Sequence, residues 1–272
     1  MTAQERSSVR SLVERGQSLS ELGWTIIDAH AHMGPTGEFY IPSPGAASMV
    51  ELMDRVGVNM TGISTHLAIT NDHVRGNNLT HQAVKGFPGR FFGYVTVNPR
   101  YDDMVSELHR GYEELGLLGI KLHPSVHDYA LTEPACEPIW HFAEQRQAFI
   151  LIHTWGGDRR CDPAVVAKVA QQHPQIRFLL GHSGGTTAGR RTAIQVAAEQ
   201  TNLYLELCSS WAASQDLEDL VNQADLRRVI YGTDTPWLDP RFMLGKIAYT
   251  SLADEQLRMI LGENMREVAD LP

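Results

Sequence analysis

A short stretch near the start of the chain, Asp28-Ala29-His30-Ala31-His32, alternates small apolar residues with residues that can bind a metal ion. On a β-strand, alternate side chains point to the same face, so Asp28, His30 and His32 are expected to share one side. Two neutral imidazoles one strand repeat apart can direct their nitrogens at one divalent ion. The stretch alone is equally compatible with ordinary surface or core histidines, so other residues must complete the site.

Three further residues with metal-binding side chains each end an apolar run. His153 follows Phe-Ile-Leu-Ile, His182 follows Phe-Leu-Leu-Gly, and Asp234 lies in the segment Tyr-Gly-Thr-Asp-Thr-Pro-Trp. The residues after each of them are typical of a functional loop. Any one could be a strand-end residue that only bonds to its loop. Five such residues at matching strand ends are improbable by chance, so the pattern predicts a metal site.

The elements that must position these residues are eight candidate strands that alternate with helices. Strands are expected at residues 25–32, 60–67, 90–98, 119–123, 149–154, 177–182, 203–209 and 229–234. Helices are expected between them at 46–56, 77–85, 103–115, 133–147, 163–172, 187–199 and 215–223, and after them at 241–251, 254–261 and 263–270. This alternation predicts a parallel sheet, and eight units predict an α/β fold of the (β/α)8 TIM-barrel type. An open doubly wound sheet is the rival, but no strand is followed by Gly-x-Gly-x-x-Gly or a phosphate loop.

Apolar alternation along each strand assigns the side chains that face the barrel interior. The inward residues nearest the C-terminal strand ends, where barrel active sites lie, are then His32, His66, Asn98, His123, His153, His182, Cys208 and Asp234. One step deeper, alternation places Asp28, Lys121 and Glu206. We expect these three to form a buried ion pair, with Asp28 supporting the site without binding the ion.

The chain resembles the metal-dependent amidohydrolase superfamily, specifically its amidohydrolase-related branch (amidohydrolase family 2), which includes hydrolases and nonoxidative decarboxylases. The matching pieces are Asp28–His32, Gly119–Pro124, His153, Gly181–Gly185, Gly232–Asp234 and the closing helix segment Ile260–Asn264. The resemblance spans Ile26 to Leu271 and implies a divalent ion held by His30, His32, His153 and Asp234. It makes His182 either a further ligand or a donor to the metal-bound water. Some members carry a carbamylated lysine that bridges two metals, which would make Lys121 a ligand. We favour the ion pair, and therefore one ion per chain.

The expected activity is a metal-dependent hydrolase that uses a metal-activated water on the C–N or C–O bond of a small carboxylate-bearing, lactone or amide substrate. Asp234 would move the proton, and His182 would stabilise the water or the developing oxyanion. The alternative is a metal-dependent nonoxidative decarboxylase of a small aromatic or unsaturated acid. Zinc is the expected ion, with Mn²⁺ and Fe²⁺ left open. Candidates for the substrate pocket, each of which could instead only contact a loop, are His66, Asn98, His123, Trp155, Arg159 and Trp237.

Two other classes of protein share parts of this pattern. A metal-binding protein without catalysis is disfavoured because the ligand set and the base Asp234 are intact. The metal-dependent deoxyribonuclease group shares the His-x-His start. Its members carry a glutamate ligand on the fourth strand, where this chain has Lys121 and His123.

Composition and charge limit the expected partners, domain organisation and location of the protein. The 272 residues carry a formal net charge of −9, which disfavours a nucleic-acid partner because phosphate backbones need a basic surface. Residues 1–23 are polar, so we expect a short N-terminal helical extension without a signal peptide, followed by one barrel domain at 24–272. No apolar run is long enough to cross a membrane. The three cysteines are few and widely spaced, which favours a reducing, cytoplasmic location. The expected partner is a small-molecule substrate, which could be anionic, and the chain could form a homo-oligomer.

Overall fold

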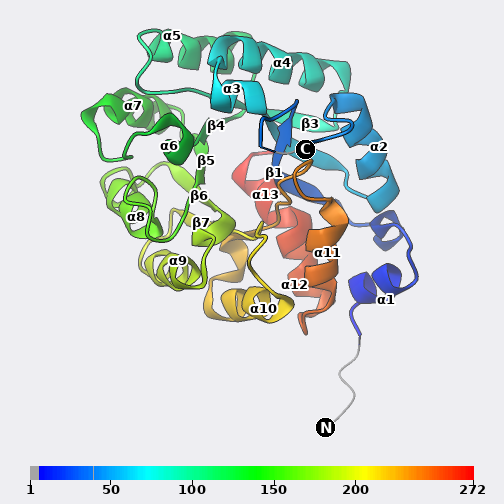
Figure 1. Cartoon of the computed structure of the whole chain (residues 1–272). Helices are drawn as coiled ribbons and strands as arrows, with labels where there is room; N and C mark the ends of the chain where they lie inside the picture. Colours follow the sequence, from blue (N-terminus) through cyan, green and yellow to red (C-terminus); the bar gives the residue numbers. More distant parts are fainter. Residues whose placement is uncertain (1–5, 39) are drawn as a thin grey trace.

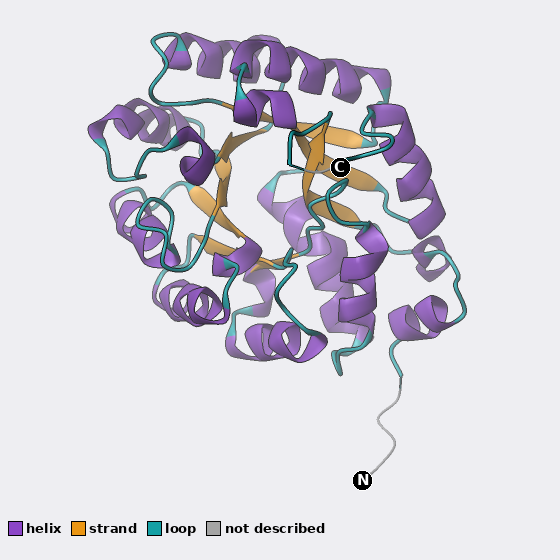
Figure 2. Ribbon diagram, viewed as in Figure 1, coloured by secondary structure: helices purple, strands orange, loops and turns teal. Residues whose placement is uncertain are grey.

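The computed structural model describes residues 6–38 and 40–272, and its centre is a ring of eight parallel strands (Figures 1 and 2). Each strand pairs with the next along the chain. The strands are β1 Ile27–Met33, β2 Met60–Thr65, β3 Phe91–Thr96, β4 Gly119–Leu122, β5 Phe149–His153, β6 Arg177–Gly181, β7 Leu203–Glu206 and β8 Val229–Ile230.

The segment after β8 brings the ring back to β1. The backbone N–H of Ala29 donates to the carbonyl of Tyr231 at 2.9 Å, and Ala31 forms a parallel bridge with Thr235. The barrel is therefore nearly closed, and the predicted (β/α)8 fold is confirmed.

Helices surround the strands on the outside (Figure 2). The α-helices are α1 Ser8–Glu14, α2 Ala46–Val56, α3 His66–Thr70, α4 His73–Gly86, α5 Met104–His109, α6 Pro124–His127, α7 Glu137–Gln145, α8 Pro163–Gln172, α9 Thr187–Glu199, α10 Ser214–Gln223, α11 Pro240–Ala248, α12 Asp254–Arg258 and α13 Asn264–Val268. Single turns of 3-10 helix lie at Leu19–Leu22, Pro134–Cys136, His182–Gly184 and Leu226–Arg228, and π-helical turns at Arg110–Glu114 and Met259–Glu263.

The predicted helices at 46–56, 163–172 and 187–199 have the observed bounds of α2, α8 and α9. Neither α3 nor α6 was predicted from the sequence. Because α3 begins directly after β2, at His66, the predicted second strand at 60–67 runs too far. In the predicted N-terminal extension, α1 packs against α11. Residues 1–5 of that extension lie outside the described residues.

The barrel interior has an apolar half at the N-terminal ends of the strands, called the lower half here, and a polar half at their C-terminal ends, called the upper half. The lower half is filled by strand residues together with α13, which closes that end of the barrel: Ile27, Ala29, Phe92, Tyr94, Phe149, Leu151, Leu179, Ile230, Met265, Val268 and Ala269. These buried apolar side chains pack against one another in one cluster. The polar residues of the interior are consequently confined to the C-terminal ends of the strands.

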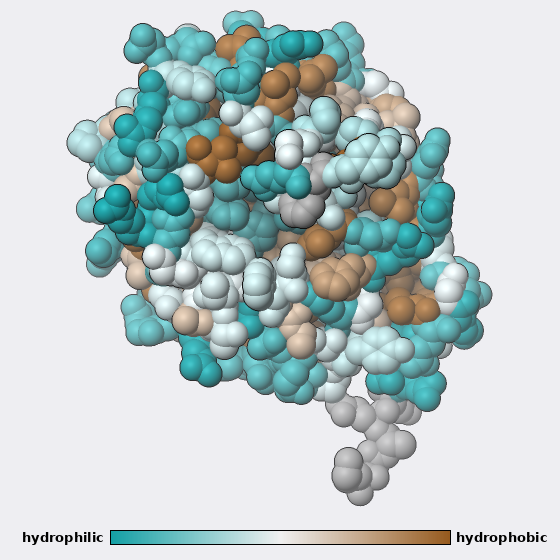
Figure 3. Space-filling view, viewed as in Figure 1, coloured by the Kyte–Doolittle hydropathy of each residue, from teal (hydrophilic) through white to brown (hydrophobic). Residues whose placement is uncertain are grey.

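No helix among the described residues combines the length and apolar character that a membrane crossing would need. On the face seen in Figure 3, hydrophilic side chains predominate and hydrophobic ones are scattered among them.

One loop helix depends on a neutral histidine. The Nε2–H of His127 in α6 donates to the carbonyl of Ile69 in α3 at 2.6 Å, and burial lowers the pKa of His127 to about 4. The unfolded chain therefore binds a proton at this position from about pH 6.5 downward, whereas the folded chain binds it only near pH 4. Stability contributed at this position is lost as the pH falls through this window.

Replacing His127 with glutamine, which keeps an N–H donor, should reduce the acid sensitivity of the fold. Between pH 7.5 and pH 5 the free energy of unfolding of the wild type should fall by about 1–2 kcal/mol more than that of His127→Gln. Urea unfolding followed by circular dichroism measures both values. Equal losses in the two proteins would show that His127 is not kept neutral by the fold.

Candidate metal and catalytic centre

The centre of the upper barrel is formed by His30 and His32 of β1 and by Asp234 after β8. The Nε2 atom of His32 lies 3.1 Å from Asp234 Oδ1, and that of His30 lies 3.8 Å from the same oxygen. The three ligand atoms all lie within 4.8 Å of one another. The structure therefore brings together three of the four residues expected as metal ligands.

The imidazole rings of His30 and His32 are each oriented by a hydrogen bond at Nδ1, the nitrogen that faces away from Asp234. Nδ1 of His30 lies 2.9 Å from Glu206 Oε2, and Nδ1 of His32 lies 3.0 Å from Ser64 Oγ. A protonated Nδ1 on each ring leaves the Nε2 lone pair free, and a carboxylate behind a ligand histidine is a common support of metal sites. The geometry therefore presents both Nε2 atoms as ligands.

The protonation states also fit a divalent cation. Burial lowers the pKa of His30 well below its usual value and that of His32 to about 4, so both rings are neutral at physiological pH. Burial alone would raise the pKa of Asp234, but its contact with His32 and the nearby His30 and His182 hold it well below its usual range. Two neutral imidazoles and one carboxylate suit zinc and similar ions.

Glu206 is a fully buried carboxylate that supports this centre. Besides His30, it accepts hydrogen bonds from the backbone N–H of His182 at 2.9 Å and of Cys208 at 2.5 Å. Burial raises its pKa to about 8, and the two backbone bonds oppose that rise. Gly232 leaves the space for it, because a Cβ there would overlap the carboxylate and would lie 2.9 Å from His30 Cβ. Glu206 thus positions His30 and the backbone of His182 together.

Lys121 contacts the same ring from the other side. Its buried Nζ lies 2.8 Å from His30 Nε2, and burial lowers its pKa to about 8. An ion at His30 Nε2 would require this amine to withdraw from that atom. Within the part of the chain that the structure describes, Lys121 lies in no ion pair with Asp28 or Glu206, so the predicted buried ion pair is wrong.

Asp28 does not share the face of His30 and His32. Along the β1–β2 pair, Asp28 lies opposite Thr61 and Ala31 opposite Ile63, so β1 carries one extra residue. Such a bulge interrupts the alternation of side chains. Asp28 instead lies beside Met49 and Met53 of α2, which corrects the expectation that it belongs to the layer beneath the metal site.

The displaced Asp28 connects β1 to the segment that carries Asp234. Its carboxylate accepts from the backbone N–H groups of His30 at 3.0 Å and Thr233 at 3.1 Å, and from the Thr233 hydroxyl. Burial raises its pKa to about 7. Because Thr233 directly precedes Asp234, these bonds fix where the Asp234 carboxylate lies.

Replacing Asp28 with asparagine should loosen the centre without removing a ligand. The amide oxygen can still accept from the two N–H groups, but the Thr233 hydroxyl loses its carboxylate partner. Affinity for Zn²⁺, measured by competition with a chromogenic chelator, should fall about 10- to 100-fold. Asp102→Asn, at an exposed position before α5, is the matched control and should bind Zn²⁺ like the wild type. Unchanged affinity in Asp28→Asn would contradict the positioning role.

His153 and His182 line the cavity beside this centre and contact each other. His182 Nε2 lies 3.1 Å from His153 Nδ1, and the ring of His153 stacks on those of His123 (4.0 Å) and Trp155 (6.1 Å). The structure therefore places the predicted ligand His153 in the same cavity but outside the group formed by His30, His32 and Asp234. A second group of potential ligands comprises His30, His182, Glu206 and Cys208, of which His30 and Glu206 already bond each other.

The backbone at two of these residues is unusual. His182 has φ 64° and Asp234 has φ 65°, values in the left-handed region that residues other than glycine seldom adopt. Such conformations concentrate at functional sites, where the surrounding structure imposes them. The predicted strands at 177–182 and 229–234 included these two residues. The observed strands β6 and β8 end before them, at Gly181 and Ile230.

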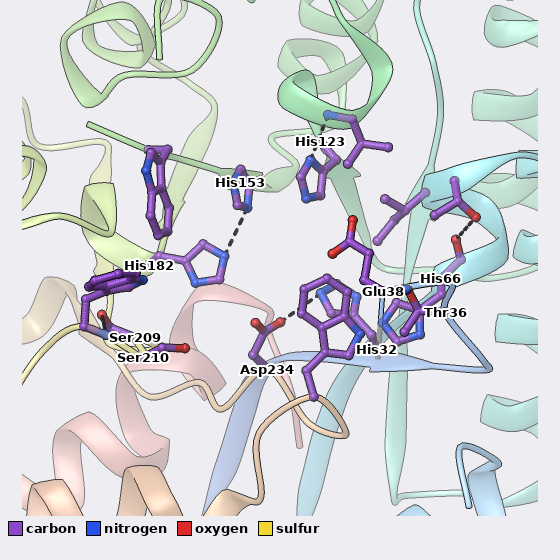
Figure 4. Close-up of a pocket in the computed structure, with 16 residues that line it drawn as sticks. His32, Thr36, Glu38, His66, His123, His153, His182, Ser209, Ser210 and Asp234 are labelled. Carbon is purple, nitrogen blue, oxygen red and sulfur yellow. Dashed lines mark hydrogen bonds and ion pairs between the residues drawn. The ribbon is translucent and has the colours of Figure 1, made fainter. Parts of the chain in front are cut away.

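Above the centre lies a cavity of about 210 Å³, shown in Figure 4. Its lining includes the predicted pocket residues His66, His123, Trp155 and Trp237 together with His32, His153, His182 and Asp234. The lining is completed by residues that were not predicted from the sequence: Thr36, Glu38, Ile69, Thr70, Val126, Ser209, Ser210 and Trp211. They come mostly from loops, for which side-chain alternation gives no signal.

Two predicted pocket residues do not line this cavity. The Asn98 side chain accepts a hydrogen bond from the backbone N–H of Arg100 at 3.0 Å, which turns it into its own loop. Arg159 is exposed and borders a separate surface hollow with Asp158 and Arg160. In both cases the loop, rather than the strand, determines the direction of the side chain.

Comparison with known proteins identifies the family to which the sequence is similar. The sequence model of the family described as Amidohydrolase matches residues 27–268. A curated relative, 2-amino-3-carboxymuconate-6-semialdehyde decarboxylase of Dictyostelium discoideum, is 27% identical over 204 residues, which cover 61% of this chain and 55% of the relative. The chain thus matches about half the length of that relative.

Solved structures share the fold at low sequence identity. The 5-carboxyvanillate decarboxylase of Sphingomonas paucimobilis matches with a TM-score of 0.72 at 15% identity, covering 92% of this chain and 100% of that one. The 2,6-dihydroxybenzoate decarboxylase from Rhizobium matches with a TM-score of 0.72 at 16% identity, covering 91% and 99%. A probable 2-pyrone-4,6-dicarboxylic acid hydrolase from Acinetobacter baumannii matches with a TM-score of 0.67 at 15% identity, covering 90% and 99%.

Proposed function

The chain belongs to the amidohydrolase family, and we propose on that premise that it is a metal-dependent nonoxidative decarboxylase of a small aromatic or unsaturated acid. The observation that carries the reaction type is the curated relative, a decarboxylase, which matches 61% of the chain. The hydrolytic reaction expected from the sequence is not confirmed and becomes the second candidate, supported by the hydrolase among the structures that share the fold.

The cavity walls support a flat substrate. Two stacked pairs of rings line the cavity: His66 and Trp237, with ring centroids 5.4 Å apart, and His123 and His153, at 4.0 Å. Planar rings prefer to pack against planar rings. An aromatic or conjugated acid can therefore pack against these rings better than a saturated one.

The ligands proposed for a single divalent ion are His30 Nε2, His32 Nε2 and Asp234, with His153 as the fourth. When bound, the ion would supply a Lewis acid that holds the substrate carboxylate and neutralises its charge. Zinc is the proposed ion. A cytoplasmic location belongs to the same proposal, because a reducing compartment keeps thiols such as the three free, buried cysteines unpaired.

The residues of the chain must deliver a proton to the carbon that loses the carboxylate. The electron pair of the breaking C–C bond stays on that carbon, CO₂ leaves, and one proton restores neutrality. His30 and His32 both face Asp234 Oδ1, so Oδ2 is the oxygen proposed to take up a proton from solvent and to pass it to the carbon. His182, held by Glu206 through its backbone and by His153 through its ring, would hydrogen-bond the substrate in the reactive orientation.

A product assay on the zinc-loaded protein tests this proposal. A panel of hydroxy- and aminobenzoates and conjugated alkenoic acids is assayed for CO₂ release, in parallel with a panel of lactones and amides assayed for hydrolysis. Release of CO₂ from an unsaturated acid is the expected result. Turnover confined to lactones or amides would replace the proposal with the second candidate.

A further inference from the structure

The charge of the cavity lining restricts which acids can enter it. Among the described residues that line it, the side chains with a formal charge are both carboxylates, Asp234 and Glu38, and none is lysine or arginine. Lys121 contacts His30 and is fully buried beneath the lining. A metal ion would therefore be the dominant positive charge that a substrate meets.

The histidines of the lining do not supply a compensating charge. The Nδ1–H of His66 donates to the carbonyl of Gly34 at 2.7 Å, and Nδ1 of His123 accepts from the backbone N–H of Val126 at 3.4 Å, so the observed contacts require no second proton on either ring. A neutral imidazole can donate or accept a hydrogen bond but cannot neutralise a second carboxylate. Away from the metal ligands, the acidic side chain of the described lining is thus Glu38.

Glu38 is the acid that faces the open part of the cavity. It lies in the loop between β1 and α2, where its backbone N–H donates to Thr36 Oγ1 at 3.3 Å. Figure 4 shows its carboxylate directed into the cavity between His123 and His32. Its charge acts on His66, whose pKa it raises against the larger effect of burial. No ion pair neutralises Glu38 within residues 6–38 and 40–272.

We infer that the cavity selects acids with a single carboxylate whose far end carries a hydrogen-bond donor, an amino or hydroxyl group, that bonds Glu38. The inference rests on the proposed function, which places the substrate carboxylate at the metal. A second carboxylate at the far end would face Glu38, which is solvent-exposed, without a counterion, and like charges at close range repel. A donor at the same place gains a charge-assisted hydrogen bond. Glu38 is thus a specificity-determining residue.

Binding of matched benzoates to the zinc-loaded protein tests this selection. The probes are the 3- and 4-isomers of aminobenzoate and hydroxybenzoate, and the corresponding benzene-1,3- and 1,4-dicarboxylates, measured by isothermal titration calorimetry. Wild type should bind the best amino- or hydroxybenzoate at least about tenfold more tightly than the matching dicarboxylate. Glu38→Gln should reduce this ratio about five- to tenfold. Glu51→Gln, which removes an exposed carboxylate from α2, should leave it unchanged.

Equal or tighter binding of the dicarboxylate by the wild type would overturn the inference, as would an unchanged ratio in Glu38→Gln or failure of every probe to bind. Because binding needs no turnover, the two proposals fail separately. If the binding ratios are as expected but no acid releases CO₂, the decarboxylase proposal is refuted and the inference about Glu38 stands. If CO₂ is released but the binding ratio is the same in wild type and Glu38→Gln, the decarboxylase proposal stands and the inference about Glu38 is refuted.

Discussion

Asp234→Asn is expected to lower kcat by about 10³-fold or more while most of the metal stays bound. The asparagine oxygen can still occupy the place of Oδ1, 3.1 Å from His32 Nε2, so the ligand arrangement survives. The amide cannot carry the proton that the reacting carbon needs. Steady-state kinetics on the substrate identified by the product assay, with metal content measured on the same sample, separates the two effects.

Asp102→Asn is the control for this experiment, since it makes the same chemical change at an exposed position. Kinetics of Asp234→Asn close to those of the wild type would remove Asp234 from the mechanism. A loss of activity that only follows a loss of metal would make Asp234 a ligand without a role in proton transfer.

Removal of the metal is expected to abolish turnover, by about 10³-fold or more, with recovery on addition of Zn²⁺. The convergence of His30, His32 and Asp234 around one point predicts one equivalent per chain. Elemental analysis of the chelator-treated and reconstituted protein measures this ratio.

Two outcomes would contradict that expectation. Two equivalents per chain, both needed for activity, would indicate a dinuclear centre and would return Lys121 to the set of ligands. Full activity after exhaustive chelation would show that the residues do not act through a metal.

Alternation along a strand predicted the interior residues correctly where the strand is regular. On β7, Glu206 is fully buried behind His30, while Leu203 and Leu205 pack in the core between strands and helices. On β1 the same rule failed for Asp28, because an extra residue in the β1–β2 pairing turns its side chain away. A bulge is a property of two strands together, so the pattern within one strand cannot reveal it.

The ends of the strands were the second source of error. His66 begins α3, and His182 and Asp234 take left-handed backbone conformations, although all three were expected to continue a strand. Local propensity disfavours such conformations, and only the surrounding contacts, such as the bonds of Asp28 to Thr233, maintain them. Glu38 and Trp211 reach the cavity from loops whose path depends on the assembled barrel.

The type of reaction could not be read from the residues either. Asp234 and His182 can transfer a proton and stabilise charge equally well when water attacks a carbonyl and when a C–C bond breaks. The choice depends on which substrate the cavity admits, and that is decided by loop residues such as Glu38.

The most direct test of the decarboxylase is the fate of the carboxylate carbon in heavy water. An active acid labelled with ¹³C in its carboxylate is converted by the zinc-loaded protein in D₂O, and the products are analysed by NMR and mass spectrometry. The account predicts one labelled CO₂ per turnover and one deuterium on the carbon that bore the carboxylate. A product that retains the labelled carbon and gains an oxygen from water would contradict it.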